Sequence, residues 1–262
     1  MRKKMCFLLF NKMYTMTSKL IINILAAGEG KRMNSSLPKV LHIFNGKPML
    51  VRIVETSLLL SPQKIIIVTG KHDELIKKTM ADYIDITDLI FVNQTIPNGT
   101  GDAIKYCLPF YENYSEVLIL NGDMPLINKR LLDRFIKNSS KYKASILVAK
   151  FNNPTGYGRI IVNNNANFVG IVEEKDCTDE QRKIKIINSG IYLFNGQILK
   201  DYIPMIDNNN AQNEYYLTDI VKIIKQNTDL LVYTDIIDEY ENKYISGVNT
   251  PEELLKLELF II

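Results

Sequence analysis

Short apolar runs alternate with helix-like segments along the first half of the chain, and this alternation limits the folds open to it. The runs are rich in β-branched residues, as buried strands are, and the segments between them carry apolar residues at helical spacing. The predicted strands of this half are residues 19–24, 64–70, 89–94 and 116–123. Strands joined by helices lie parallel, with right-handed crossovers and with helices on both faces of the sheet. We therefore predict an α/β fold with a Rossmann-like, mostly parallel sheet.

The second half differs, because predicted strands follow one another there with only short Asn- and Gly-rich turns between them. These strands are residues 144–151, 158–164, 168–174 and 187–195. We expect strands that continue the sheet and a hairpin that forms a β-rich lobe over a crevice. No Pro-, Gly- or Ser-rich linker separates the halves. Residues 19–262 are therefore predicted to be one domain, preceded by an N-terminal extension at residues 1–18.

The composition narrows the class of function. Of the 262 residues, 46% are hydrophobic and 23% are charged, which is ordinary for a soluble globular protein. The net charge of +3 is small and no basic stripe with interleaved aromatic residues occurs, so no binding to nucleic acid is expected. The two histidines, His42 and His72, argue against a histidine zinc site or a Ser-His-Asp triad.

Cysteine usage and the N-terminus favour a cytoplasmic protein. Cys6, Cys107 and Cys177 are far apart and form no CxxC pair, which is typical of reduced thiols. The apolar patch MCFLLF at residues 5–10 is too short for a secretion signal or for a membrane span. We therefore expect a cytoplasmic location and no contact with a membrane.

The stretch LAAGEGKRMNSSLPKVLH, residues 25–42, combines glycines and cations directly after the first predicted strand. Gly28 and Gly30 have no Cβ, so the backbone can turn tightly there and approach a ligand closely. Arg32 and Lys39 follow as cations, which suggests a loop that binds phosphate. The spacing matches neither G-x-x-x-x-G-K-[ST] nor G-x-G-x-x-G, so a P-loop kinase and an NAD dehydrogenase are disfavoured.

Three polar features are expected to meet in space. The glycine loop at residues 25–42, Gln94 and the NGD motif at residues 121–123 each follow a predicted strand. In open α/β sheets, ligands bind beyond the carboxyl ends of the strands. The sequence therefore predicts one ligand-binding crevice that all three features line.

A series of motifs over roughly residues 20–258 resembles the N-acetylglucosamine-1-phosphate uridyltransferase family of sugar nucleotidyltransferases. The stretch at residues 25–42 is common to sugar nucleotidyltransferases in general. The narrower resemblance rests on PTGYGRI, VEEKDCTDEQ and NNNAQNEYYLTDI, accompanied by GTGDAI, LNGDMPLI, INSGIYL and GVN. It implies a fold of the nucleotide-diphospho-sugar transferase type. It also implies transfer of UMP from UTP to N-acetylglucosamine 1-phosphate, giving UDP-N-acetylglucosamine and pyrophosphate, by Mg²⁺-assisted in-line attack on the α-phosphate.

The resemblance further implies roles for individual residues. The catalytic cations, which neutralise the triphosphate, would be Arg32 and Lys39. The nucleotide would be bound by Leu25, Ala26, Ala27, Gly28, Gln94, Gly99, Thr100, Asn121, Gly122 and Asp123. The sugar phosphate would be bound by Gly158, Glu173, Asn188, Tyr216, Thr218 and Asn249. The Mg²⁺ ligands would be Asp123 and Asn249.

The chemistry of these residue types fits the implied roles. Gln94 has an amide donor and an acceptor, which uracil O4 and N3–H require. The carboxylate of Glu173 can accept two hydroxyl hydrogen bonds from a sugar. The plainer alternatives are that Gln94 is a solvated glutamine at a strand end and that Glu173 is an exposed acid. The attacking phosphate has a second pKa of about 6 and is already ionised at neutral pH, so no general base is required.

Several features depart from the family pattern. Asn121 stands where relatives commonly have Tyr, and TIPN replaces a Gln-containing run before Gly99. Glu29 places a negative charge in the glycine loop, so it is expected to weaken UTP binding unless it points to solvent. The sequence also lacks the hexapeptide repeats of an acetyltransferase β-helix. We expect no acetyltransferase domain, and a monomer or weak dimer.

Other functions stay open at this point. The same chemistry could serve another sugar 1-phosphate or another nucleotide. A non-catalytic sugar-nucleotide-binding regulatory protein is a second class, but it would be expected to have lost Arg32, Lys39 or Asp123. An NAD-binding module would need an acidic residue about 20 positions beyond its glycines, at a strand end, whereas Glu55 lies in a helical pattern.

Overall fold

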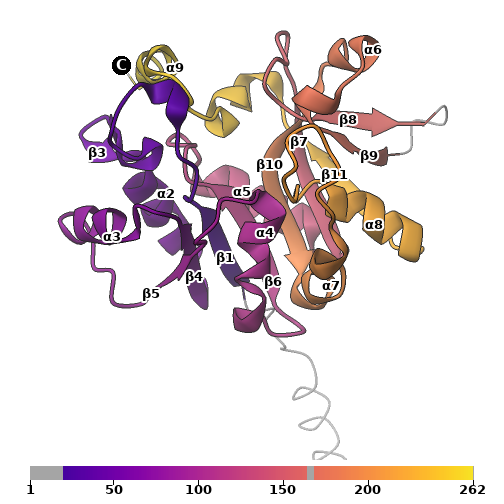
Figure 1. Ribbon diagram of the computed structural model, residues 1–262, viewed down its shortest axis with the longest axis horizontal. Coiled ribbons are helices and arrows are strands. Elements are labelled where there is room, and N and C mark those ends of the chain that lie inside the picture. The colour runs from indigo at the N-terminus through magenta and orange to yellow at the C-terminus, as the bar shows by residue number, and fades with distance from the viewer. Residues whose placement is uncertain (1–19, 164–167, 262) are drawn as a thin grey trace, which may run out of the picture.

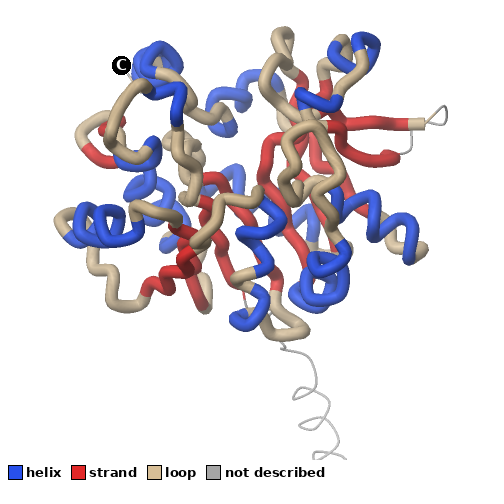
Figure 2. Tube along the Cα trace, viewed as in Figure 1, coloured by secondary structure: helices blue, strands red, loops and turns tan. Residues whose placement is uncertain are grey.

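One mixed sheet forms the centre of the protein, and helices lie on both of its sides (Figures 1 and 2). The computed structural model describes residues 20–163 and 168–261. The N-terminal extension expected at residues 1–18 lies outside the described residues. The predicted α/β fold with a mostly parallel sheet is confirmed.

Seven strands form the main path of this sheet within the described residues, in the order β11-β7-β10-β6-β1-β4-β5. Their bounds are β1 Leu20–Leu25, β4 Lys64–Thr69, β5 Leu89–Asn93, β6 Glu116–Asn121, β7 Ala144–Lys150, β10 Ile186–Asn195 and β11 Val232–Ile236. β1 pairs in parallel with β6 and β4, β4 pairs in parallel with β5, and β7 pairs in parallel with β11. Strands buried on both faces need continuous apolar runs, which is why these segments, apart from β11, were recognisable in the sequence.

β10 runs antiparallel to both of its neighbours, β6 and β7, an orientation that the alternating pattern did not predict. β7 ends at Lys150, whose partner in the ladder is Ile186 at the start of β10. The intervening chain forms the hairpin of β8 (Arg159–Val162) and β9 (Phe168–Val172), followed by α6 (Asp179–Arg182). Because this segment stays at the carboxyl end of β7, the chain re-enters the sheet from that end. The hairpin is the expected β-rich lobe.

Helices cover both faces of the sheet. Their bounds are α2 Met49–Leu58, α3 Asp73–Ala81, α4 Thr100–Lys105, α5 Lys129–Ser139, α7 Gly196–Tyr202, α8 Asp219–Asn227 and α9 Pro251–Glu258. α2, α3 and α5 pack on one face with Ile22 and Ile24 of β1, whereas α4, α7 and α8 pack on the other face with Ile21. Successive side chains of a strand point to opposite faces, so β1 contributes to both cores. A smaller cluster joins α9 to the ribbon of β2 (Ile43–Phe44) and β3 (Lys47–Pro48).

No helix within the described residues is long and apolar enough to cross a membrane. Cys107 and Cys177 are buried free thiols. Burial raises the pKa of the Cys107 thiol to about 12, so this side chain is an unreactive part of the core.

Candidate active site

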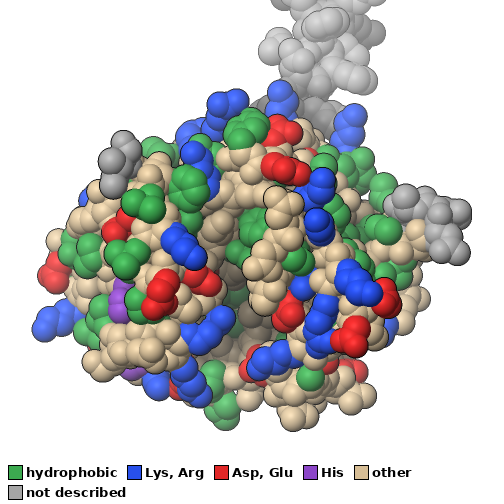
Figure 3. Space-filling view, turned by 90° about the horizontal axis from the view of Figure 1, so that it is seen from above, with side chains coloured by type: hydrophobic (Ala, Val, Ile, Leu, Met, Phe, Trp, Pro, Cys, Tyr) green, Lys and Arg blue, Asp and Glu red, His purple; other side chains and the backbone are tan. Residues whose placement is uncertain are grey.

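Two adjoining cavities open at the carboxyl ends of the parallel strands, on the face that Figure 3 shows to be grooved between Lys, Arg, Asp and Glu side chains. The loop cavity, of about 590 Å³, is lined by the glycine loop, Gln94 and Gly99. The lobe cavity, of about 400 Å³, is lined by Gly158, Glu173 and Asn188. Both cavities share Leu25, Arg32, Thr100, Asn121, Asp123 and Asn249. Two ligands bound side by side would therefore meet at these shared residues.

The glycine loop is held against Lys39 by a conformational requirement at Gly30. This residue has φ 61°, and a Cβ there would lie 2.5 Å from the Cβ of Lys39. Only glycine combines that backbone conformation with so close an approach. By contrast, a Cβ added at Gly28 would meet nothing within 4 Å. The turn Lys39–Leu41, which follows Pro38, then directs Lys39 to the crevice.

Glu29 is paired with two lysines. Its carboxylate lies 2.7 Å from Lys71 Nζ and 3.0 Å from Lys31 Nζ. The hydrogen bond from Lys71, followed by that from Lys31, lowers the pKa of Glu29 to about 2. The negative charge expected to weaken UTP binding is thus neutralised locally, but two cations near the loop are engaged in doing so.

The ammonium group of Lys39 joins the two side chains assigned from the sequence as metal ligands. Nζ donates to Asp123 Oδ2 and to Asn249 Oδ1, the latter at 3.0 Å. The three residues come from the glycine loop, the end of β6 and the segment before α9. Folding therefore brings a carboxylate oxygen and an amide oxygen to one point, where both bind a cation.

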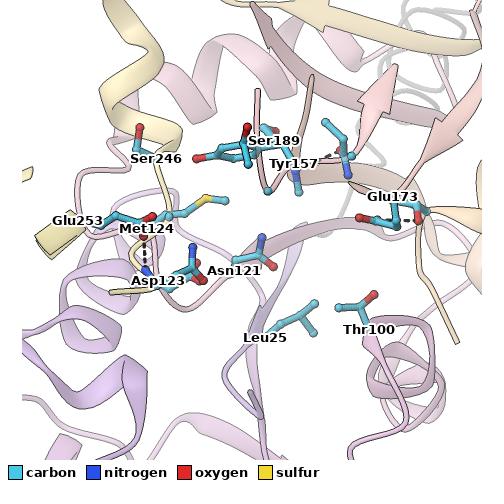
Figure 4. Close-up of a pocket in the computed structure, with 18 of the residues that line it drawn as sticks. Leu25, Thr100, Asn121, Asp123, Met124, Tyr157, Glu173, Ser189, Ser246 and Glu253 are labelled. Carbon is cyan, nitrogen blue, oxygen red and sulfur yellow. Dashed lines mark hydrogen bonds between the residues drawn. The ribbon is translucent and has the colours of Figure 1, made fainter. Parts of the chain in front are cut away.

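Backbone contacts fix Asn249 beside Asp123. Val248 N–H donates to the Asp123 carbonyl at 2.9 Å, and Asn249 N–H donates to Glu253 Oε2 at 2.6 Å. Thr250 caps α9 by accepting a hydrogen bond from Glu253 N–H at 3.2 Å. In Figure 4, Glu253 and Asp123 lie close together at the same side of the cavity. The start of α9 thus holds the Asn249 amide in place.

The oxygen pair fits a divalent cation that is bound partly by its substrate. In the ranges 20–163 and 168–261, no three His, Cys, Asp or Glu side chains gather in a way that could cage a metal. Asp123 and Asn249 offer one carboxylate and one amide oxygen. Mg²⁺ keeps several waters and is commonly held by one or two carboxylates plus substrate phosphates, so this small ligand set is suited to it.

Asn121 ends β6 at the junction of the two cavities. In Figure 4 it lies between Leu25 and Thr100 on one side and Ser189 on the other. Gly190, with φ 79°, lets Asn121 pack closely against β10, because a Cβ at Gly190 would overlap Asn121 Nδ2. The departure from Tyr at this position therefore places an amide at the junction.

Gln94 is only 3% exposed and lines the loop cavity. Its Nε2 donates to the Gly99 carbonyl at 3.1 Å and to Asp102 Oδ2 at 2.8 Å. These two bonds use both amide hydrogens, so Oε1 is the group left for a ligand. Gln94 was expected to supply a donor as well as an acceptor, and in the folded protein its donor is already engaged.

The lobe cavity presents carboxylate, hydroxyl and amide groups. Glu173 Oε1 accepts a hydrogen bond from Thr218 Oγ1 at 3.0 Å. Burial raises the pKa of Glu173, and the Thr218 hydrogen bond offsets part of that rise. Asn188 Nδ2 donates to the Tyr192 hydroxyl at 2.6 Å, and Asn188 Oδ1 accepts from Gly190 N–H at 3.1 Å. Such a set of fixed polar groups suits a ligand with several hydroxyls.

The structure describes all the site residues named from the sequence, and most of them line the cavities. The loop cavity has Leu25, Ala27, Gly28, Arg32, Lys39, Gln94, Gly99, Thr100, Asn121, Asp123 and Asn249. The lobe cavity adds Gly158, Glu173, Asn188 and Thr218. The remaining three, Ala26, Gly122 and Tyr216, line neither cavity. Gly122 supports the wall instead, since its N–H donates to the Leu25 carbonyl at 2.8 Å.

Several lining residues were not expected from the sequence. In the lobe cavity they are Met124, Thr155, Gly156, Tyr157, Ser189, Gly190, Tyr192, Leu217, Ser246, Gly247, Glu253, Lys256 and Leu257. Tyr192 follows Asn188 and Gly190 at a spacing of two residues along one strand, and that period could have identified it. Ser246, Glu253 and Lys256 lie near Asn249, which the motif resemblance named, but no local pattern indicates that their own side chains reach the site.

A mostly parallel α/β sheet with a cationic glycine loop at its carboxyl edge, next to a polar second cavity, is the arrangement expected of a nucleotide-binding transferase. The chain belongs to the nucleotidyl transferase family, whose profile matches residues 22–240. This membership agrees with the resemblance to sugar nucleotidyltransferases seen in the motifs.

Three proteins of known sequence are similar to most of this chain. The chain is 42% identical over 243 residues to a protein of Acanthamoeba polyphaga mimivirus named probable UDP-N-acetylglucosamine pyrophosphorylase, covering 92% of this chain and 95% of that protein. It is 39% identical to the bifunctional protein GlmU of Prochlorococcus marinus and 40% identical to that of Gloeothece citriformis. These two matches cover 92% and 89% of this chain. This chain spans only about half of the length of each bifunctional protein, namely 53% and 50%. The resemblance drawn from the motifs is confirmed.

Solved structures confirm the fold. HddC of Yersinia pseudotuberculosis, in a complex with GMP-PN, matches with a TM-score of 0.66 and 23% identity. A second HddC structure matches with the same TM-score and 22% identity. Each match covers 92% of this chain and 99% of the other.

Proposed function

We propose that the protein transfers UMP from UTP to N-acetylglucosamine 1-phosphate, which yields UDP-N-acetylglucosamine and pyrophosphate. The observation that carries the proposal is that two adjoining cavities share Arg32, Asp123 and Asn249. With UTP in the loop cavity and the sugar phosphate in the lobe cavity, the reacting phosphates would meet at these residues. The name of the 42% identical relative supports this pair of substrates.

The loop cavity would bind UTP. Gln94 Oε1 would accept a hydrogen bond from uracil N3–H, and the open position at Gly28 would let phosphates approach the backbone. Arg32 and Lys39 would bind the triphosphate, with Arg32 able to contact two oxygens through its planar guanidinium group. The charge of Glu29, held by Lys71 and Lys31, would add little repulsion.

The lobe cavity would bind the sugar phosphate. The Glu173 carboxylate, with Oε1 already bonded to Thr218, has acceptor capacity left for a sugar hydroxyl. Asn188 is held by Tyr192 and Gly190, so its amide would meet the N-acetyl or hydroxyl groups without reorganising. These contacts would fix the sugar so that its phosphate points to the shared residues.

The reaction requires positioning and charge neutralisation. An oxygen of the sugar phosphate attacks the α-phosphorus of UTP, the bond from this phosphorus to the α,β-bridging oxygen breaks, and its electron pair leaves with pyrophosphate. The attacking group has a second pKa of about 6, so no base has to remove a proton at neutral pH. Arg32 and Lys39 would stabilise the charge that develops on the leaving group. Asp123 and Asn249 would hold Mg²⁺, which supplies further neutralisation of the phosphates when bound.

The proposal is tested by pyrophosphate release from UTP, CTP, GTP or ATP with Mg²⁺ and a panel of sugar 1-phosphates. We expect the highest kcat/KM for UTP with N-acetylglucosamine 1-phosphate. The panel also tests the alternative of another sugar 1-phosphate. An enzyme that binds both substrates but releases no pyrophosphate would refute the catalytic proposal and favour a regulatory protein.

A further inference from the structure

The Gln94 carboxamide is held by two hydrogen-bond acceptors that lie on the same side of it. Nε2 donates to the Gly99 carbonyl at 3.1 Å and to Asp102 Oδ2 at 2.8 Å. A carbonyl oxygen has no proton to donate, and neither has a carboxylate. Turning the carboxamide over would place Oε1 against both of these oxygens. The orientation in which Oε1 faces the loop cavity is therefore enforced by Gly99 and Asp102 together.

The framework around this contact is rigid. Gln94 N–H donates to the Thr69 carbonyl at 2.8 Å, which ties the end of β5 to β4. Gly101 N–H donates to the Tyr215 carbonyl at 2.7 Å, and a Cβ at Gly99 would lie 2.6 Å from that same oxygen. The start of α4, which carries both acceptors, is thus packed directly on the backbone of Tyr215. Neither partner of Gln94 can move away easily.

Asp102 lines neither the loop cavity nor the lobe cavity, whereas Gln94 and Gly99 both line the loop cavity. Of the two bonds to Nε2, the one to Asp102 is shorter and is assisted by the carboxylate charge, and charge-assisted bonds are roughly twice as strong as neutral ones. Asp102 is therefore the stronger of the two orienting contacts.

We propose that Asp102 is a positioning residue that fixes Gln94 as a pure acceptor and so makes the loop cavity prefer uracil to cytosine. The inference rests on the proposed role of this cavity as the nucleotide site. Uracil has N3–H, which can donate to Gln94 Oε1. Cytosine has an unprotonated N3, whose lone pair would face the same oxygen, and the locked carboxamide cannot turn to offer its NH₂ group instead.

The test is direct binding of UTP and CTP, measured by titration calorimetry without sugar phosphate. In the wild type we expect tighter binding of UTP. Asp102→Asn keeps the shape of the side chain but adds a donor, so the introduced amide and the Gln94 amide could turn together. We expect the preference for UTP to fall by about tenfold, mainly through tighter CTP binding, because a bond to a charged group is lost. If Asp102 had a purely structural role at the start of α4, the substitution would weaken the binding of both nucleotides equally.

A rescue experiment tests the same contact independently. Gln94→Glu places a carboxylate against Asp102 and the Gly99 carbonyl, so we expect UTP binding to be lost. Adding Asp102→Asn to this variant supplies a donor to the new carboxylate and should restore part of the UTP affinity. Asp179→Asn is the matched control, since it removes an exposed first-turn carboxylate from α6, away from Gln94.

The outcomes separate this inference from the proposed function. An unchanged UTP:CTP ratio in Asp102→Asn, or no rescue in the double variant, overturns the role of Asp102 while wild-type UTP binding leaves the nucleotide site intact. If the wild type binds neither nucleotide, the proposed function fails with it. A changed ratio with rescue supports the inference.

Discussion

Lys39 Nζ and Asn249 Oδ1 lie 3.0 Å apart, although 210 residues separate them in the chain. The same ammonium donates to Asp123, and the side chains of Lys39 and Asp123 are each only 15% exposed. A cation thus already occupies the point where these two oxygens converge. A divalent ion bound by the same oxygens has to replace the ammonium, which would free Lys39 for the phosphates.

This relationship predicts how the protein binds a divalent cation in the absence of nucleotide. Lys39→Met removes the competing ammonium but keeps much of the side-chain volume, so Mn²⁺ should bind more tightly by about tenfold or more, as expected when a bond to a charged group no longer has to be broken. The loss of free Mn²⁺ signal in electron paramagnetic resonance measures this affinity. Lys47→Met, which removes a lysine paired with Glu55 instead, is the control. Equal Mn²⁺ affinities in wild type and Lys39→Met would show that the ammonium does not compete.

Asp123→Asn should lose turnover without losing the fold. The variant keeps the size of the side chain but removes its charge from the shared wall, so kcat should fall at least about a hundredfold, as on loss of a transition-state contact. The melting temperature should change little, because an amide oxygen can still accept from Lys39 Nζ, and the cap of α5 is Asn128, whose Oδ1 accepts from Leu131 N–H at 3.0 Å. Asp133→Asn, an exposed carboxylate on α5, serves as control. Near-normal turnover in a folded Asp123→Asn protein would move the metal site elsewhere.

The first half of the fold was predictable because its information is local. β1, β4, β5 and β6 are short apolar runs, and α2 to α5 show apolar residues at helical spacing. Each of these elements could therefore be predicted from its own sequence. β11 was not predicted. It pairs with β7, which lies more than 80 residues earlier in the chain, and its Tyr-Thr-Asp centre lacks a continuous apolar run. Such an edge strand is specified by its partner more than by its own sequence.

Glu29→Gln tests the lysine pairing in the glycine loop. The substitution removes the carboxylate that holds Lys71 and Lys31, so both cations become available to a polyanion and UTP should bind a few-fold more tightly at low ionic strength. The gain should disappear at about 1 M salt, where the Debye length is about 3 Å. Calorimetric UTP titrations at the two salt concentrations measure the effect. Weaker UTP binding in Glu29→Gln would mean that the pairs shape the loop instead of merely neutralising Glu29.

Glu173→Gln should separate stability from sugar binding. Burial raises the pKa of Glu173 above its ordinary 4.5 in the folded state. The free energy of unfolding of the wild type therefore decreases as the pH rises from 4.5 to the raised pKa of the folded protein. The glutamine variant should therefore be more stable than the wild type at pH 7, and the difference should vanish at about pH 4. Urea unfolding at both pH values measures it.

The same variant should bind sugar phosphate more weakly. Loss of a hydrogen bond to a charged acceptor should raise KM for N-acetylglucosamine 1-phosphate about tenfold or more, with a smaller change in KM for UTP. Thr218→Val is the companion variant, because removing the donor to Glu173 should make the protein less stable than the wild type at pH 7. A Glu173→Gln protein with unchanged sugar-phosphate KM would place the sugar elsewhere.

The residues that form the site were largely predictable from the sequence, but the contacts between them were much less so. Motif resemblance named Lys39, Asp123 and Asn249, but no local pattern indicates that one ammonium joins residues 84 and 210 positions away. Likewise the residue type of Gln94 indicates a donor and an acceptor, and only the fold shows that Asp102 and Gly99 use the donor. Side-chain orientation is set by tertiary neighbours, so it lies beyond what spacing and composition report.

The most direct test of the proposed function is to identify the products of the complete reaction by phosphorus NMR. UTP, N-acetylglucosamine 1-phosphate and Mg²⁺ are incubated with the protein, and the phosphorus signals are followed with time. The proposed reaction gives equal amounts of UDP-N-acetylglucosamine and pyrophosphate, at a rate that Asp123→Asn should reduce strongly. Consumption of UTP to UMP without a nucleotide sugar, or no consumption by a protein that binds both substrates, would contradict it.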